Sequence, residues 1–179
     1  MRLMRITGPA GSGKDTIADF LVARHDFTKI SCAEPLKAGL TAMGFPEPRN
    51  RDDKEKIIPG FDFSWREAAQ KLGTEWGRAL DPDVWVKALE RRMRRADDRF
   101  VIADVRFENE AEMIRRRGGI LLFLHGRAAD LGANAGHTSE AGLQFLEGVD
   151  HLIDTGCDFE QTRARVERIL LAYEKENRV

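Results

Sequence analysis

The stretch that decides the fold is Gly8-Pro9-Ala10-Gly11-Ser12-Gly13-Lys14-Asp15-Thr16. It follows a short apolar segment, residues 2–7, that is typical of a β-strand. It precedes residues 14–24, whose apolar side chains recur at helical spacing. Glycines in such a loop allow several backbone N–H groups to converge without a side chain in the way. The positive end of the following helix points at the same place. The stretch therefore predicts a phosphate-binding loop.

The spacing Gly8-x4-Gly13-Lys14, between a strand and a helix, is that of a Walker A motif. Lys14 is expected to be catalytic, because it places a full charge at the bridging and terminal oxygens of a triphosphate. The predicted phosphate-binding residues are Gly8, Ala10, Gly11, Ser12, Gly13, Lys14, Asp15 and Thr16.

One position departs from this motif, because Asp15 follows the lysine where Ser or Thr is usual, and the hydroxyl comes one place later at Thr16. Adjacent helix positions differ by roughly 100°, so Thr16 cannot simply replace the usual Mg²⁺ ligand. Asp15 should face the metal or a cation, since an unpaired carboxylate beside a triphosphate would be repulsive; a helix N-terminal acid favoured by the dipole is the alternative. Asp104 ends an apolar strand, as a Walker B acid does, and is expected to hold Mg²⁺ directly or through water. Capping of the next turn is its alternative role. The candidate metal ligands are Asp15, Thr16 and Asp104.

The rest of the chain alternates apolar strands with amphipathic helices. Such strands indicate a parallel sheet covered on both faces. We therefore predict a single α/β domain over residues 1–179, with the three-layer P-loop NTPase fold and about five parallel strands. The further strands are expected at residues 27–31, 100–103, 120–124 and 151–154, and the last helix at 159–175.

Residues 33–96 interrupt this alternation, because they contain no convincing strand. The sequence Ser64-Trp65-Arg66-Glu67 is a capping box that opens a helix through Leu72. Asp81-Pro82-Asp83 has the signals of a second helix start. We predict a helical insertion over 33–96, and a mobile lid in the Gly- and Ala-rich residues 126–142.

Composition argues against nucleic-acid-binding, membrane-spanning and secreted proteins. The 179 residues carry a formal net charge of −1, which argues against a protein held on nucleic acid by bulk charge. No apolar run approaches the roughly 20 residues of a membrane span, and the first residues do not resemble a secretory signal. A cytoplasmic protein is therefore expected. Arginine outnumbers lysine 21 to 8, which suits phosphate binding but also fits codon bias in a GC-rich genome.

Several blocks together resemble the deoxynucleoside monophosphate kinases of bacteriophages, which are P-loop members of the nucleoside monophosphate kinase group. The most specific blocks are Leu72-Gly73-Thr74-Glu75-Trp76-Gly77-Arg78 and Asp104-Val105-Arg106-Phe107-Glu108-Asn109-Glu110. The resemblance implies transfer of the γ-phosphoryl group of ATP, with Mg²⁺, to a deoxynucleoside 5′-monophosphate. The diphosphate product would serve DNA synthesis, in the host cytoplasm if the chain is phage-encoded. A homodimer is left open, since kinases of this group often pair.

In nucleoside monophosphate kinases the region of this insertion closes over the acceptor. Arg66 and Arg78 are accordingly expected to clamp the acceptor phosphate, and Lys37 to reach it. Gln70 is expected to read a base edge. The remaining acceptor-binding candidates are Trp76 and Trp85, which could stack on a base or pack in the core.

Two arginines are catalytic candidates beside Lys14. Arg106 and Arg127 each follow a strand, and a cation between donor and acceptor phosphates would neutralise transition-state charge. Arg106 could instead pair with Asn109 or Glu110.

Three other functions compete with this interpretation. A related P-loop kinase, resembling phosphomevalonate kinase or dephospho-CoA kinase, would share the loop and the early Pro35-Leu36-Lys37 region. A nucleotide-binding switch is disfavoured, because no Asn-Lys-x-Asp motif or DxxG follows the expected strands. A noncatalytic nucleic-acid module is disfavoured by net charge.

Overall fold

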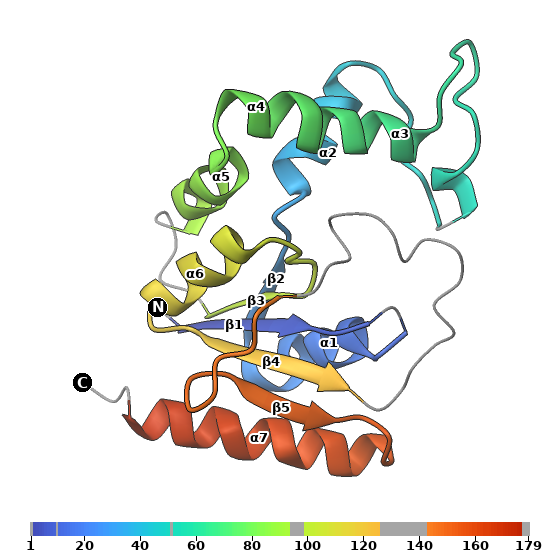
Figure 1. Cartoon of the computed structure of the whole chain (residues 1–179). Helices are drawn as coiled ribbons and strands as arrows, with labels where there is room; N and C mark the ends of the chain where they lie inside the picture. Colours follow the sequence, from blue (N-terminus) through green and yellow to red (C-terminus); the bar gives the residue numbers. More distant parts are fainter. Residues whose placement is uncertain (1, 10, 51, 94–98, 126–142, 177–179) are drawn as a thin grey trace. The chain divides into compact units, whose positions relative to one another are not determined.

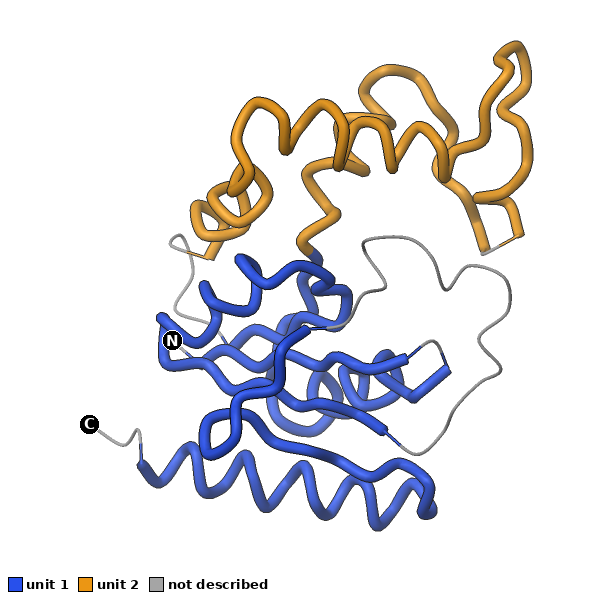
Figure 2. The backbone as a smooth tube through the Cα atoms, in the orientation of Figure 1, with its two compact units in different colours: residues 1–31, 97–179 blue, residues 32–96 orange. Residues whose placement is uncertain are grey.

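The computed structural model describes residues 2–9, 11–50, 52–93, 99–125 and 143–176. The chain divides into two compact units, coloured separately in Figure 2. The first unit consists of Met1–Ser31 and Asp97–Val179, and the second of Cys32–Ala96. The second unit covers nearly the same residues as the predicted insertion. The predicted lid, residues 126–142, lies outside the described residues.

The first unit is built on one parallel sheet of five strands in the order β2-β3-β1-β4-β5 (Figure 1). The strands are β1 (Arg2–Thr7), β2 (Phe27–Ile30), β3 (Arg99–Ile102), β4 (Ile120–His125) and β5 (His151–Asp154). Each predicted strand is present, with ends that differ by one residue at most. The predicted α/β fold is confirmed.

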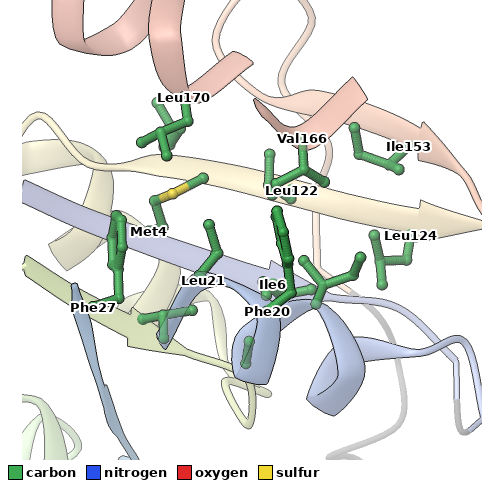
Figure 3. Close-up of a cluster of buried hydrophobic side chains, with 14 of the residues drawn as sticks. Met4, Ile6, Phe20, Leu21, Phe27, Leu122, Leu124, Ile153, Val166 and Leu170 are labelled. Atoms are coloured by element: carbon green, nitrogen blue, oxygen red, sulfur yellow. The ribbon is translucent and has the colours of Figure 1, made fainter. Parts of the chain in front are cut away.

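One face of the sheet is covered by α1 (Lys14–His25) and α7 (Phe159–Glu176). Between them and the strands lies the main core, in which Met4 and Ile6 of β1 meet Leu21 of α1 and Leu170 of α7 (Figure 3). The helical spacing of the apolar residues in both helices places one stripe of each against the sheet. Because β1 and α1 are both packed into this core, the two ends of the loop that joins them are fixed.

The opposite face is covered by α6 (Glu108–Arg116), whose Ala111 and Ile114 are fully buried. Because side chains alternate along β1, Arg5 points away from the face of Met4 and Ile6. Arg5 is fully buried, and its Nη2 donates to the carbonyl oxygen of Val105 at 3.1 Å. The sheet thus has helices on both faces, as a three-layer fold requires.

The second unit is helical and has its own small core around Leu36, Leu40, Ile58 and Trp65. Its elements are α2 (Glu34–Ala42), η1 (Asp52–Lys54), α3 (Trp65–Gln70), the π-helix η2 (Lys71–Gly77), α4 (Arg78–Leu80) and α5 (Val84–Met93). Helix α2 was not predicted from the sequence, and the helix predicted to end at Leu72 instead continues through η2 and α4.

The capping box at the start of α3 is confirmed. The Ser64 hydroxyl accepts from the Glu67 N–H at 3.2 Å, and the Ser64 N–H donates to the Glu67 carboxylate at 2.7 Å. Among the helices of the described ranges, none has both the length and the apolar character that a membrane crossing requires.

Candidate active site

The loop between β1 and α1 has the backbone of a phosphate-binding loop. Gly11 and Gly13 adopt φ angles of 76° and 90°, which side-chain-bearing residues rarely adopt. A Cβ atom on Gly8 would stand 2.6 Å from the carbonyl oxygen of Leu124, so only glycine fits this close to β4. Gly13 is the N-cap of α1 and has no side chain to accept from the first N–H groups of that helix. An anion at this helix start could accept from N–H groups that no side-chain cap occupies.

Two polar side chains of the loop fit a phosphate ligand. The Lys14 ammonium group donates to the carbonyl oxygens of Gly8 and Pro9 at 2.8 and 2.7 Å, so it lies folded over the loop. Ser12 is 1% exposed, and within the described part of the chain its hydroxyl oxygen has no hydrogen-bond partner. A buried hydroxyl without a partner is costly, and a phosphate oxygen in the loop would satisfy it.

Asp15 faces a cation. The sequence predicted that it would face either a metal or a cation, with a role as a helix N-terminal acid as the alternative. Its carboxylate accepts from the ammonium group of Lys29, on β2, at 2.8 Å. Lys29 also donates to Asp19 at 2.9 Å. Burial alone lowers the pKa of Lys29, but the two carboxylates outweigh it and raise that pKa. Asp15 thus has a protein cation as its partner, and its predicted contact with Mg²⁺, like that of the exposed Thr16, stays a prediction.

Asp104 lies two residues beyond the end of β3, where the parallel strands bring it to the same edge as the loop. The Ser31 hydroxyl, just past the end of β2, donates to its Oδ2. The next arginine, Arg106, is exposed, and its backbone N–H donates to the Glu110 carboxylate at 2.9 Å. Glu110 also accepts from the Phe107 N–H at 3.3 Å and so caps α6.

Arg115 anchors the segment before β5 to α6. Its guanidinium donates to both oxygens of Asp150, at 3.2 and 2.7 Å, and to Glu108 at 2.6 Å. The Asp150 side chain is fully buried, and it also accepts from the Leu146 N–H at 2.8 Å. The bond to Asp150 raises the pKa of Arg115 against the effect of burial. This arrangement fixes residues 143–150 against the sheet unit.

In the second unit, the predicted phosphate clamps are both engaged within the chain. Arg66 donates through Nε to Glu55, and Arg78 donates to the Pro82 carbonyl oxygen at 3.0 Å. Lys37 is half-buried on α2.

The two tryptophans predicted to stack on a base differ in their surroundings. Trp76 is 57% exposed and lines an open, largely apolar hollow of about 520 Å³, together with Met43, Phe45 and Leu72. Gln70 is exposed on the same helical run but does not line that hollow.

Trp85 is held by packing. Its indole N–H donates to the Gly73 carbonyl oxygen at 2.7 Å, and its ring covers Gly77, where a Cβ atom would stand 2.6 Å from Trp85 Cζ2. This is the core role that the sequence left open as an alternative; stacking on a base stays a prediction.

The structure thus brings the loop residues, Asp15 and Asp104 to one edge of the sheet. Ala10 and Arg127, predicted for phosphate binding and catalysis, lie outside the described residues. Sequence reasoning missed Lys29 and Ser31. The signal for Ser31 was a hydroxyl directly after an apolar strand, at the edge where α/β proteins bind ligands. Within the described ranges, no group of three or more His, Cys, Asp or Glu side chains could hold a metal ion.

Known proteins resemble this chain in sequence and in fold. A protein of Acanthamoeba polyphaga mimivirus named "Putative deoxynucleotide monophosphate kinase" is 26% identical over 186 residues, covering 93% of this chain and 94% of that protein. Shikimate kinase from Aquifex aeolicus superposes with a TM-score of 0.52 at 18% identity, covering 98% of both chains. A gluconokinase from Sinorhizobium meliloti gives 0.51 at 15% identity, covering 98% of this chain and 97% of that one. The likeness to these structures shows the fold of P-loop kinases.

The profile of the deoxynucleotide monophosphate kinase family matches residues 52–166, which are more than half of the chain. This range begins after the phosphate-binding loop, so the loop and the family match are observations on different parts of the sequence. The family match indicates a kinase that acts on a small molecule, and the loop is consistent with phosphate binding by such an enzyme. The chain belongs to the deoxynucleotide monophosphate kinase family.

Proposed function

We propose that the protein transfers the γ-phosphoryl group of ATP to a deoxynucleoside 5′-monophosphate. The observation that carries this proposal is the loop from Gly8 to Lys14, with its left-handed glycines, its folded lysine and the buried Ser12 hydroxyl. The family supplies the class of acceptor.

The chemistry asks little of a general base. At pH 7 the acceptor phosphate oxygen is already ionised; it forms a bond to the γ-phosphorus while the bond to the β–γ bridging oxygen breaks, leaving ADP. Catalysis therefore rests on alignment and on cations around the transferred group. Lys14 and the amides of the loop would hold the donor phosphates. The exposed Arg106, two residues past Asp104, would neutralise charge at the same edge.

Asp104 is the side chain best placed to hold Mg²⁺. It is a half-buried carboxylate at the edge of the sheet that bears the loop. Mg²⁺ in kinase sites keeps several waters and uses one or two carboxylates beside the substrate phosphates, a donor set that Asp104 fits. When bound, the ion would screen the negative charge between the phosphoryl groups.

The acceptor would be held by the second unit. Arg66, Arg78 and Lys37 are the proposed partners of its phosphate, and Gln70 and Trp76 those of its base. In this proposal the acceptor phosphate takes the place of Glu55 beside Arg66, since a dianionic phosphate is a stronger partner than a single exposed carboxylate.

A substrate screen tests the reaction. ATP consumption should be measured with all four deoxynucleoside monophosphates, their ribonucleotide counterparts, mevalonate phosphate and dephospho-CoA. Turnover confined to the nucleotides is expected. Turnover with mevalonate phosphate or dephospho-CoA alone would assign the chain to a related kinase activity.

A matched pair of variants tests the acceptor site. Arg66→Ala should raise the KM for the acceptor at least tenfold with little change in the KM for ATP. Glu55→Ala removes the competing carboxylate, and should leave the acceptor KM unchanged or lower it. If the ion pair is only structural, the two variants will behave alike, and Arg66 loses its assignment.

A further inference from the structure

Two features of the phosphate-binding edge belong together. In P-loop NTPases, Mg²⁺ is held by the hydroxyl that follows the loop lysine and by an acid at the end of a neighbouring strand. Here the residue after Lys14 is Asp15, and its carboxylate is occupied by the Lys29 ammonium group at 2.8 Å. The usual hydroxyl is therefore missing at its usual position.

A different hydroxyl reaches the strand acid. Ile30 of β2 pairs with Ile102 of β3, so the residues that follow these strands emerge side by side at the carboxyl edge. There the hydroxyl of Ser31 donates to Oδ2 of Asp104. Both side chains are half-buried, which shields their hydrogen bond from competing water.

The sheet order puts this pair next to the loop. Strand β3 lies between β2 and β1, and Arg5 of β1 pairs with the same Ile102. Counting forward in parallel register, Thr7 comes level with Asp104, and the loop begins at Gly8. The hydroxyl–carboxylate pair thus lies beside the start of the loop, with each member following a different strand.

We infer that Ser31 is a positioning residue for the metal carboxylate, and that the pair Ser31–Asp104 replaces the hydroxyl–carboxylate pair that this loop lacks. The hydroxyl fixes one oxygen of Asp104 and so sets the direction of the other toward the divalent cation of a metal–nucleotide complex. Asp15, held by Lys29, takes no part in this pair. The inference rests on the proposed function only in requiring that a nucleotide be bound, and not on the identity of the acceptor.

Mn²⁺ is the probe, because its paramagnetism reports binding without turnover. Electron paramagnetic resonance should follow free Mn²⁺ titrated into the full-length protein with a non-hydrolysable ATP analogue and no acceptor. Loss of a residue that orients a metal ligand costs about 10- to 100-fold in metal affinity. We expect Ser31→Ala to weaken Mn²⁺ binding at least tenfold. Ser31→Thr keeps the hydroxyl, and its affinity for Mn²⁺ should stay within about threefold of the wild type.

Controls separate this role from general damage. Thr28→Ala removes an exposed hydroxyl from β2, the strand that Ser31 follows, and should leave Mn²⁺ affinity unchanged. If Ser31→Ala folds poorly, Ser31→Cys keeps the side-chain size with a weaker donor and should show an intermediate loss. The inference is overturned if Ser31→Ala binds Mn²⁺ as tightly as the wild type. It is also overturned if Thr16→Ala weakens Mn²⁺ binding while Ser31→Ala does not. Because no acceptor is present, a failed substrate screen would not affect this result.

Discussion

Replacing Asp150 by alanine should destabilise the first unit by about 3–4 kcal/mol. Breaking a buried ion pair by removing one partner costs about 3–5 kcal/mol, because the other charge is left in the interior. The Asp150 side chain is fully buried, and Arg115 is 11% exposed. Glu108, at 2.6 Å from Arg115, remains as a second partner and keeps the cost near the lower end of that range. The Leu146 N–H also loses its acceptor, which adds to the cost.

For a chain of this length, each kcal/mol shifts Tm by about 2–4 °C, so a fall of about 6–16 °C is expected. Thermal unfolding should be followed by circular dichroism, because all three tryptophans lie in the second unit and would not report on the first. Glu160→Ala is the matched control, since it breaks an exposed pair with Arg163 at 2.9 Å that is worth less than about 1 kcal/mol. If the two variants shift Tm equally, the buried pair does not anchor this segment and the reasoning is refuted.

Three further changes have defined outcomes. Gly8→Ala should weaken ATP binding, measured by calorimetry, at least tenfold, because its Cβ atom would stand 2.6 Å from a carbonyl oxygen. Gly148→Ala is the control: its φ is 76°, but a Cβ atom there would have no neighbour within 4 Å, so the affinity for ATP should not change. Glu67 has a lowered pKa because it accepts the N–H at the start of α3, so its contribution to stability is present above pH 4.5 and is lost as pH falls through the folded-state pKa. Urea unfolding followed by tryptophan fluorescence should show this loss, and Glu67→Gln should remove it. Trp85→Phe should cost the second unit about 1–2 kcal/mol in the same assay, since the Gly73 carbonyl loses its donor; an unchanged midpoint would show that water replaces the indole.

Local patterns predicted β1, β3 and β4 because these inner strands are largely buried and mostly apolar, whereas the edge strands β2 and β5 are partly exposed and gave a weaker signal. The loop from Gly8 to Lys14 was equally visible, since its function requires particular residue types at fixed spacing. Ser31 could not be assigned in this way. Its partner Asp104 lies 73 residues away, and only the order β2-β3-β1 makes them neighbours. Strand order depends on pairing between distant segments, which no short window of sequence contains.

The helical unit was harder to predict because its glycines resemble stop signals. The sequence predicted a helix from the capping box through Leu72, which is followed by Gly73 and, four residues later, by Gly77. In the structure both glycines stay within the helical run, because side chains from other helices approach too closely for a Cβ atom: Leu36 at Gly73 and Trp85 at Gly77. These glycines allow close packing between helices. Backbone propensity, which counts glycine as a helix breaker, does not contain this information.

The core beneath the sheet has an evolutionary consequence. Every buried side chain in the cluster of Figure 3 comes from outside residues 32–96. One continuous block of sequence can therefore diverge, or be exchanged between lineages by recombination, without opening a cavity among those residues. Selection on new substrates can then act on that block, while the nucleotide-binding scaffold is inherited intact.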